Sequence, residues 1–366
     1  MAAKCTCDVR TIESATAAEL YLTVVPTGGT AHDLYGAIAD ILRDQRAVIV
    51  QERLFASADF VATALAARAD AYADLDDGVL PSLLNPRTSS GNIAGVQVHA
   101  IRGIEQPAMV YLEGNAVGRT FQCQGQTYLT ATGLCAPQLR DAPAQTRRIF
   151  QTFGSLLSQS GGTLFDIART WIWMDDILGW YPQLNQERNA FFNQQRLLQP
   201  PNHMPASTGI GISPAAGRVA MDLFAAWGQR DTITRFHAAG NQRSACEYGS
   251  AFARASRAIT PAGQTIFCSG TAAIDASGKT LFLNDIANQV RMTVDNVHAV
   301  LRDMHCGSAD VVQAMAYCAT PEVQQHFLAL YADKLPWPCL TMLGDVCRDD
   351  LLFEIEVTAA VAMPPA

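Results

Sequence analysis

Two stretches of the chain repeat the same spacing of apolar residues. One begins at Arg148 and reads RIFQTFGSLLSQSGGTLFDIARTWIW, and the other begins at Met292 and reads MTVDNVHAVLRDMHCGSADVVQAMAY. Aligned without a gap, both place apolar residues at i, i+3 and i+7, as at Val294, Val297 and Leu301 in the second stretch. An apolar stripe at this spacing is typical of an amphipathic helix, so each stretch is predicted to begin with one.

Each predicted helix ends at a glycine-containing turn and is followed by a short apolar run, IARTWIW in the first half and VVQAMAY in the second. Aromatic and β-branched residues in such runs indicate buried strands. Second helices are predicted at 184–198 and 321–335, and closing strands at GRVAMDLFAA and LLFEIEVTAAV. In the second half, QTIFCSGTAAI and KTLFL are predicted to pair as strands through the turn from Asp275 to Gly278.

This recurring order of strand, helix, strand, helix and strand predicts an α+β fold in which helices pack on one face of a mixed β-sheet, twice in one chain. The two copies meet near 227–231, which divides the chain into an N-terminal domain, 1–228, and a C-terminal domain, 229–366. The first 100 residues add helical material, such as ADFVATALAARADAYADL, with no counterpart in the second half. We interpret it as an elaboration of the N-terminal domain.

The charge of the chain argues against nucleic-acid binding. The formal net charge is -8 and Lys and Arg form no dense stripe, whereas nucleic-acid binding requires a concentrated positive surface. No segment reaches the roughly 18 consecutive apolar residues of a membrane span, and the opening MAAKCTC lacks the apolar centre of a signal peptide. We therefore expect a cytoplasmic protein that acts on a small molecule, with no membrane or nucleic-acid partner.

The ten cysteines are scattered, mostly inside apolar segments, as expected of small buried side chains in a reducing compartment. Cys5 and Cys7 form a C-x-C pair, but neither a second pair at zinc-site spacing nor a histidine cluster accompanies it. The sequence therefore predicts neither a disulfide framework nor a metal site.

The second half resembles the RidA family, also called YjgF. The resemblance rests on FCSGTAAID, with an S-G turn after an early strand, on the D-N helix in VRMTVDNVHAVLRDMHCGSADVVQAMAY, and on the E-I-E motif of the closing strand DLLFEIEVTAAV. The first half resembles the family more weakly, through FGSLLSQSGGTLFDIARTWIWMDDI and MPASTGIGISP. Two such domains, with a Y-G-S-x-F-x-R-A stretch before the second, resemble the chorismatases. The resemblance implies tandem RidA/YjgF-like (chorismate-mutase-like) domains.

Two positions separate the halves from the wider family and from each other. RidA enzymes hold a substrate carboxylate with the arginine of a P-A-R-S turn, but the matching turns here read PAS at 205–207 and PCL at 338–340. The missing arginine weakens an imine- or enamine-deaminase function. The first glutamate of the E-I-E strand is Glu354 in the second half, whereas Ala220 stands at the matching place in the first. Catalysis is therefore expected in the C-terminal domain.

Glu354 shares one face of its strand with Glu356, because side chains alternate across a strand. The pattern alone favours a solvated face that carries two carboxylates. The resemblance implies instead that Glu354 is the catalytic general acid/base. That role requires a carboxyl that stays protonated, through burial or through the carboxylates of the substrate.

Cys347 lies seven residues before Glu354. A small buried thiol would explain the residue without any catalytic role. In chorismatases the residue at this place separates reaction types, and a cysteine resembles the members that form hydroxybenzoate. The resemblance implies that the thiol occupies the space that a nucleophilic water needs and can hydrogen-bond the ring hydroxyl. No neighbouring histidine suggests an activated thiolate, so a covalent nucleophile is not expected.

Three further residues are candidates for substrate binding. Arg254 is the best candidate for a bidentate clamp on a carboxylate, although an exposed strand arginine would fit the same pattern. Tyr248 either donates a hydrogen bond to an enolpyruvyl group or packs against its neighbours. Arg169, just before TWIWMDD, is a candidate to reach a cleft between the halves.

The resemblance implies an enzyme that converts chorismate to 3-hydroxybenzoate and pyruvate, and it leaves 4-hydroxybenzoate open as a second product. Proton transfer and electrostatic positioning need no cofactor. Hydrolysis to a dihydroxycyclohexadiene carboxylate, RidA-like imine hydrolysis and binding without turnover are the alternatives. RidA proteins are trimers with sites between subunits, so this chain is expected to act as a monomer or a homotrimer.

Overall fold

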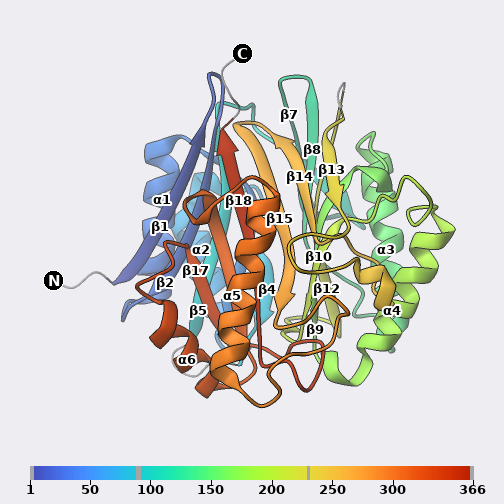
Figure 1. Cartoon of the computed structure of the whole chain (residues 1–366). Helices are drawn as coiled ribbons and strands as arrows, with labels where there is room; N and C mark the ends of the chain where they lie inside the picture. The colour runs from blue at the N-terminus through green and yellow to red at the C-terminus, as the bar shows by residue number, and fades with distance from the viewer. Residues whose placement is uncertain (1–3, 88–91, 229–230, 363–366) are drawn as a thin grey trace.

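The computed structural model describes residues 4–87, 92–228 and 231–362. Within these ranges the strands form three six-stranded sheets, and two α-helices accompany each sheet (Figure 1). We call the corresponding parts of the chain the first, middle and third units.

Apart from the edge strands β6, β11 and β13, the helices and strands of the three units follow one another in the same order. The first unit contains β1 (Cys5–Glu13), β2 (Ala18–Pro26), α1 (Ala31–Gln45), β3 (Val48–Ala56), α2 (Val61–Tyr72), β4 (Ser82–Asn85) and β5 (Ile93–Arg102). The middle unit contains β6 (Ala108–Leu112), β7 (Asn115–Cys123), β8 (Gln126–Cys135), α3 (Ala142–Gln159), β9 (Ile167–Met174), α4 (Ile177–Gln194), β10 (Ala206–Ile210), β11 (Ser213–Pro214) and β12 (Val219–Gly228). The third unit contains β13 (Ile233–Phe236), β14 (Ala255–Thr260), β15 (Gly263–Ala272), α5 (Ile286–Asp303), β16 (Val311–Cys318), α6 (Pro321–Tyr331), β17 (Cys339–Leu343) and β18 (Phe353–Ala362).

One strand order recurs in all three sheets. It is β1-β2-β5-β3-β4 in the first unit, β7-β8-β12-β9-β10 in the middle unit and β14-β15-β18-β16-β17 in the third. In each sheet the last pair of this order is parallel and the other pairs are antiparallel. β11, β6 and β13 each add one edge strand. The three units are therefore structural repeats.

The predicted α+β fold is confirmed, but the number of repeats is three where the sequence predicted two. Residues 5–102, interpreted as an elaboration of a single domain 1–228, form a complete unit of their own. Strand β3 reads VIVQERLFA. Its three consecutive polar residues break the apolar pattern of a buried strand, although the strand is almost entirely buried. The predicted boundary between 228 and 229 falls between β12 and β13.

The predicted strand KTLFL is wrong. One isolated bridge, between Ile274 and Thr280, joins this segment to the residues that follow β15, and the strands that pair with β15 are β14 and β18. Phe282 and Asn284 have φ angles of 54° and 60°, in the left-handed region, and such angles interrupt an extended strand. An apolar run alone therefore did not distinguish a loop from a strand.

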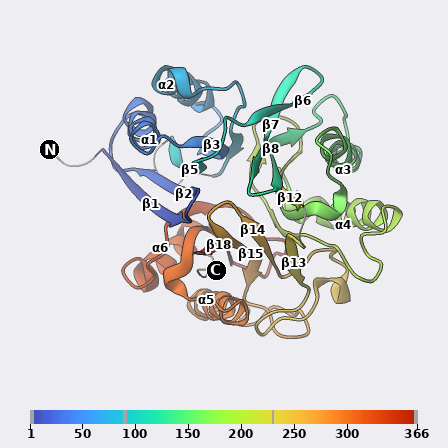
Figure 2. The same ribbon diagram turned by 90° about the horizontal axis from the view of Figure 1, so that it is seen from above.

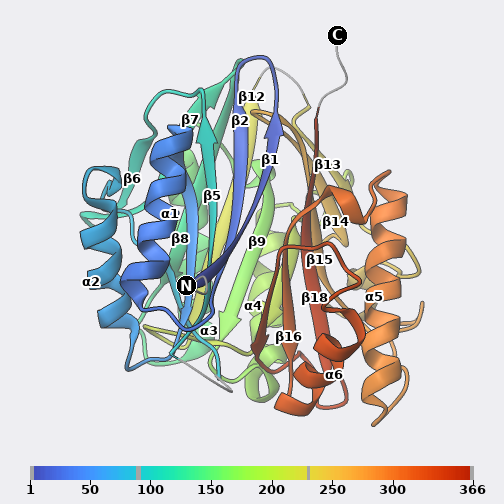
Figure 3. The same ribbon diagram turned by 90° about the vertical axis from the view of Figure 1, so that its left-hand side faces the viewer.

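The three sheets face one another around the centre of the molecule, and the helices lie outside (Figure 2). Figure 3 shows α1 and α2 on the outer side of the first sheet, with α5 and α6 on the opposite side of the molecule. One apolar cluster fills the space between each sheet and its helices, and a fourth, which includes Phe55, Trp171 and Phe267, joins the three units at the centre. No helix among the described residues combines the length and apolar character needed to cross a membrane.

The centre also contains a ring of buried polar side chains at one repeated strand position. Glu356 lies opposite Met315, Asp222 opposite Trp171, and Gln97 opposite Arg53 in the registers of their sheets. The side chain at each of these three positions forms a hydrogen bond with a residue of a neighbouring unit. The contacts are Arg169 Nη2 to Glu356 Oε2 (2.7 Å), Arg53 Nε to Asp222 Oδ2 (3.0 Å) and Gln97 Nε2 to the Ala314 carbonyl (3.1 Å).

A second buried polar cluster joins the first and third units. Glu19 is 1% exposed and accepts hydrogen bonds from His99 Nε2 at 3.0 Å and from the backbone N–H of Ala262 at 2.9 Å. The ring of Tyr21 stacks on His99, and its hydroxyl contacts Thr265 at 2.9 Å. Burial would raise the pKa of Glu19, but the hydrogen bonds and the charge of His99 together lower it.

We expect Glu19→Gln to lower the free energy of unfolding at neutral pH by about 3 kcal/mol, because it removes one partner of a buried pair. A carboxyl whose pKa is lowered on folding stabilises the fold above its unfolded pKa, roughly 4.3, and this contribution is lost as the pH falls through its folded pKa. Denaturant unfolding should therefore show a difference between wild type and variant at pH 7 that shrinks in acid. Glu13→Gln, which alters an exposed pair with Arg102, is the control and should change stability little.

Candidate active site

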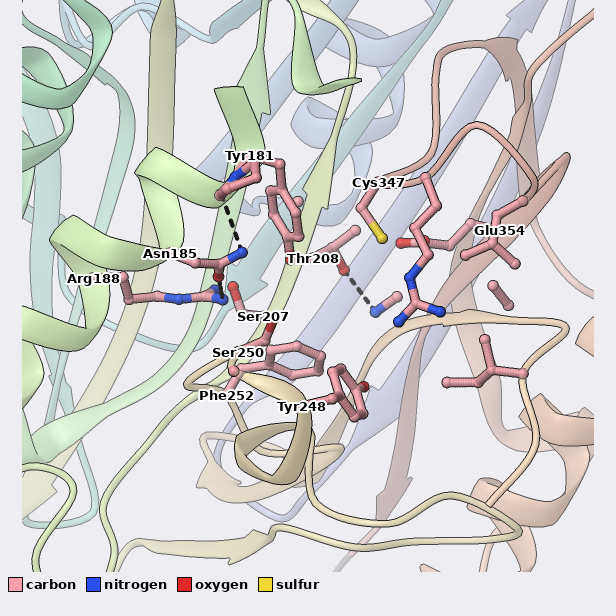
Figure 4. Close-up of a pocket in the computed structure, with 18 of the residues that line it drawn as sticks. Tyr181, Asn185, Arg188, Ser207, Thr208, Tyr248, Ser250, Phe252, Cys347 and Glu354 are labelled. Carbon is pink, nitrogen blue, oxygen red and sulfur yellow. Dashed lines mark hydrogen bonds between the residues drawn. The ribbon is translucent and has the colours of Figure 1, made fainter. Parts of the chain in front are cut away.

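A cavity of about 400 Å³ lies between the middle and third units. Residues of α4 and β10 form one wall, and residues of β15, β18 and the loops before β14 and β18 form the other. In Figure 4, Tyr181, Asn185 and Arg188 project from α4 on one side, while Cys347 and Glu354 lie on the opposite side. Two units of the same chain therefore build this cavity.

Glu354 is the second residue of β18 and lines the cavity, with 6% of its surface exposed. The neighbouring strand β15 has a β-bulge between Cys268 and Thr271, which places Gly270 against the carboxyl group. A Cβ atom at Gly270 would overlap Glu354 Oε1. Glycine in the S-G turn therefore makes room for the carboxyl.

The environment of Glu354 favours its protonated form. Burial, together with the negative charge of Glu356, raises the pKa of Glu354 to about 8, while Arg254, Arg169 and Arg348 oppose the shift. Glu356 is also buried, with 4% exposed, so the solvated strand face that the pattern favoured is wrong. At neutral pH the Glu354 carboxyl holds a proton that it can donate.

The strand registers locate the counterparts of Glu354 in the other two units. Glu354 lies opposite Tyr317, Ala220 lies opposite Trp173, and Gly95 lies opposite Phe55, all at the same place in the repeated sheet. The match between Glu354 and Ala220 agrees with the sequence alignment. A Cβ at Gly95 would overlap the side chain of Leu340, so that interface is filled. Of the three equivalent positions, one carries a carboxyl.

Arg254 and Tyr248 both line the cavity and contact each other. Arg254 is 3% exposed; its Nε donates to the Arg243 carbonyl at 2.9 Å and its Nη2 donates to the Tyr248 hydroxyl. Its guanidinium also lies 5.3 Å from the ring centres of Tyr248 and Phe252. These contacts hold a buried positive charge at the cavity wall, and Arg254 is therefore not the exposed strand arginine that the pattern also allowed.

Cys347 lines the same wall as Glu354, and Figure 4 shows its sulfur near the Glu354 carboxyl group. Burial, and then the negative charge of Glu354, raises the pKa of the Cys347 thiol to about 12. The thiol therefore stays protonated at neutral pH. It can donate a weak hydrogen bond and fill space, but it is not an activated nucleophile.

Arg169, a sequence candidate for substrate binding, does not line the cavity. It is 2% exposed, and its Nη2 donates to Glu356 Oε2 at 2.7 Å and also to Thr208 Oγ1. Thr208 in turn lines the cavity and accepts the backbone N–H of Gly270 at 3.0 Å. The Nη2 atom is thus committed to protein partners, while Nη1 is buried without a hydrogen-bond partner among the described residues. The contribution of Arg169 to the site is therefore indirect.

Sequence reasoning missed the residues that α4 contributes. Arg188 is 3% exposed, lines the cavity and donates from Nη2 to Asn185 Oδ1, while its Nε has no hydrogen-bond partner among the described residues. Its guanidinium lies 5.6 Å from the ring centre of Phe252. In the sequence Arg188 belongs to a polar helical segment, NQERN, which has the pattern of a solvated helix face. Only the folded structure shows that these polar residues of α4 face a cavity and not solvent.

The charged residues that line the cavity are unequal in sign. Arg188, Arg254 and Arg348 carry positive charges, and Glu354 is the acidic residue among the described lining residues. Arg348 donates from Nη1 to the Gly278 carbonyl at 2.6 Å, which fixes it at the cavity edge. With Glu354 protonated, the cavity is strongly positive although the chain carries a net charge of -8. Such a site suits a small dianion.

Comparison with known proteins agrees with this fold. The family model described as Endoribonuclease L-PSP matches residues 249–361, which cover most of the third unit. No curated protein matches the chain. A chorismatase crystal structure is 19% identical and matches 96% of this chain and 100% of that chain, with a TM-score of 0.66.

Smaller solved structures match about a third of the chain each. The Rid-family protein YyfA from Yersinia pestis is 22% identical over 35% of this chain and 99% of its own, with a TM-score of 0.30. A member of the YjgF family from Mycobacterium tuberculosis is 24% identical over 36% of this chain and 100% of its own, with a TM-score of 0.28.

The class of protein follows from the family model, which matches the third unit, and from the strand order that the other two units share with it: an α+β protein built from three repeats of one fold. Over 96% of the chain, the particular arrangement of these repeats matches the fold of a chorismatase. The resemblance to chorismatases inferred from the sequence is confirmed at the level of the fold.

Proposed function

We propose that this protein is a chorismatase, which converts chorismate to 3-hydroxybenzoate and pyruvate. The observation that carries the proposal is Glu354, a buried carboxyl that holds its proton at neutral pH in a cavity otherwise charged by arginines. The chorismatase fold supports the same assignment.

The cavity suits chorismate in size and charge. Chorismate carries two carboxylates, an enol ether to pyruvate at ring carbon 3 and a hydroxyl at carbon 4. A cavity of about 400 Å³ lies within the range of small-molecule sites. Arg188 and Arg254 come from the two facing walls, so each is placed to bind one carboxylate, and Arg348 adds a third positive charge.

The proposed reaction begins with proton transfer. The Glu354 carboxyl protonates the methylene of the enol ether, which becomes the methyl group of pyruvate as the bond from ring carbon 3 to oxygen breaks. The hydroxyl on carbon 4 attacks carbon 3 and returns its proton to the Glu354 carboxylate, forming an arene oxide. The bond between this oxygen and carbon 4 then opens, carbon 3 loses its proton, and the ring becomes aromatic. No water is consumed, and the arginines stabilise the charges that move.

Glu354→Gln should abolish proton donation and lower kcat by at least about a hundredfold, measured as pyruvate release from chorismate. In the wild type, kcat/KM should fall as the pH rises through about 8, because Glu354 then loses the proton it must donate. The variant should keep its circular dichroism spectrum and still bind 3-hydroxybenzoate. Full activity in Glu354→Gln would refute the role of this carboxyl.

Arg188→Gln should lower kcat/KM for chorismate by roughly tenfold or more, because it removes a charge-assisted hydrogen bond to a carboxylate. Arg147→Gln is the matched control. Arg147 lies on the surface, outside the cavity, and pairs with Glu187, the residue that precedes Arg188 in the sequence. Steady-state kinetics that show equal effects in both variants would contradict a binding role for Arg188.

Cys347→Ala should shift the product from 3-hydroxybenzoate toward the dihydroxycyclohexadiene carboxylate, because the smaller side chain admits a water that hydrolyses the enol ether. Chromatography of the products, including 4-hydroxybenzoate, measures the ratio. Cys339→Ala, which changes a cysteine outside the cavity, is the control. An unchanged ratio in Cys347→Ala would show that the thiol does not select the product.

A further inference from the structure

We propose that Glu356 and Arg169 are positioning residues for Glu354: their ion pair, which joins the third unit to the middle unit behind the cavity, sets the pH at which the acid loses its proton. This inference rests on the proposed function of Glu354 as the proton donor. It adds a role for two residues that do not line the cavity.

The geometry places Glu356 directly behind the acid. Residues 354 and 356 alternate along β18 and point to the same side, about 7 Å apart along the strand. Both are almost completely buried. Glu356 Oε2 accepts from Arg169 Nη2 at 2.7 Å, and Oε1 accepts from Trp171 Nε1 at 2.8 Å. The negative charge of Glu356 is therefore held in one place by two side chains of the middle unit.

Arg169 also reaches the part of the backbone on which Glu354 rests. Besides Glu356, Arg169 donates to the Thr208 hydroxyl, and the same oxygen accepts the N–H of Gly270 at 3.0 Å. Gly270 is the residue whose missing side chain leaves room for Glu354 Oε1. The pair is thus connected to the acid twice, through the charge of Glu356 and through the Thr208 contact with the bulge.

The other charged groups near Glu354 lie on the cavity side. Arg254 and Arg348 line the cavity and would be compensated by the carboxylates of bound substrate. The Glu356–Arg169 pair remains unchanged on the buried side. Removing Glu356 would leave the Arg169 charge uncompensated and favour the ionised acid. The remaining titratable neighbours of Glu354 are Cys347, Tyr181 and Tyr317.

The test compares two substitutions with opposite expected effects. Glu356→Gln should move the alkaline limb of the kcat/KM profile to lower pH by about one unit or more, because a charge about 7 Å away in a buried site shifts a pKa by that amount. Arg169→Gln should move the limb to higher pH. The double variant Glu356→Gln, Arg169→Gln removes the pair without leaving a buried charge unpaired, and it keeps the test open if one single variant fails to fold.

Asp222→Asn is the matched control. Asp222 occupies the position of Glu356 in the middle unit, is fully buried and pairs with Arg53, but this pair joins the middle unit to the first unit and not to the third unit, which carries Glu354. It should lower the melting temperature as Glu356→Gln does, yet leave the pH profile in place. Equal loss of stability in both variants, with the alkaline limb unmoved in both Glu356→Gln and Arg169→Gln, would reduce the pair to a structural role and overturn the proposal.

Infrared titration of the protein without substrate separates this proposal from the proposed function. The carboxylic acid band that disappears in Glu354→Gln belongs to Glu354, and its titration midpoint should shift in Glu356→Gln and Arg169→Gln in the directions given above. If the titration midpoint shifts but neither the wild type nor any variant releases pyruvate from chorismate, the positioning role is supported and the chorismatase function is refuted. Pyruvate release with an unshifted midpoint in both variants would do the reverse.

Discussion

The structure depends on one constraint: a polar side chain buried at the centre of the molecule must find its partner in the next unit. The inner faces of the sheets carry Glu356, Asp222 and Gln97 at one repeated strand position, and each bonds to a neighbouring unit. A buried charge without a partner is strongly destabilising. No single sheet supplies these partners, so the three units are required together, and the cavity between two of them has a fixed shape.

The candidate active site is a local departure from this threefold arrangement. At the strand position that faces each interface, the units carry Gly95, Ala220 and Glu354. Leu340 fills the space next to Gly95. Beside Glu354, by contrast, the bulge at Gly270 and the arginines of the cavity walls surround an acid. The same backbone therefore provides packing at one interface and a site for chemistry at another.

The sequence predicted what depends on local periodicity and missed what depends on contacts between units. The helices α3 and α5, the strands β9 and β16 and the contrast between Glu354 and Ala220 could all be derived from spacing and from internal similarity. The first unit was missed because β3 carries Gln51, Glu52 and Arg53. These residues look exposed in the sequence, but all three are buried, and Glu52 and Arg53 pair with Arg68 and Asp222 on other elements. For the same reason the sequence suggested Arg169, which pairs with Glu356 and does not line the cavity, and it missed Arg188, which does.

Linking three repeats in one chain has a consequence for how the protein can vary. In a homotrimer, every substitution appears at all three interfaces, so a residue that suits a reaction at one must be tolerated at the others. Here each interface is encoded separately, and a carboxyl at Glu354 coexists with the close packing of Leu340 against Gly95. A substitution at one interface therefore leaves the residues of the other two unchanged.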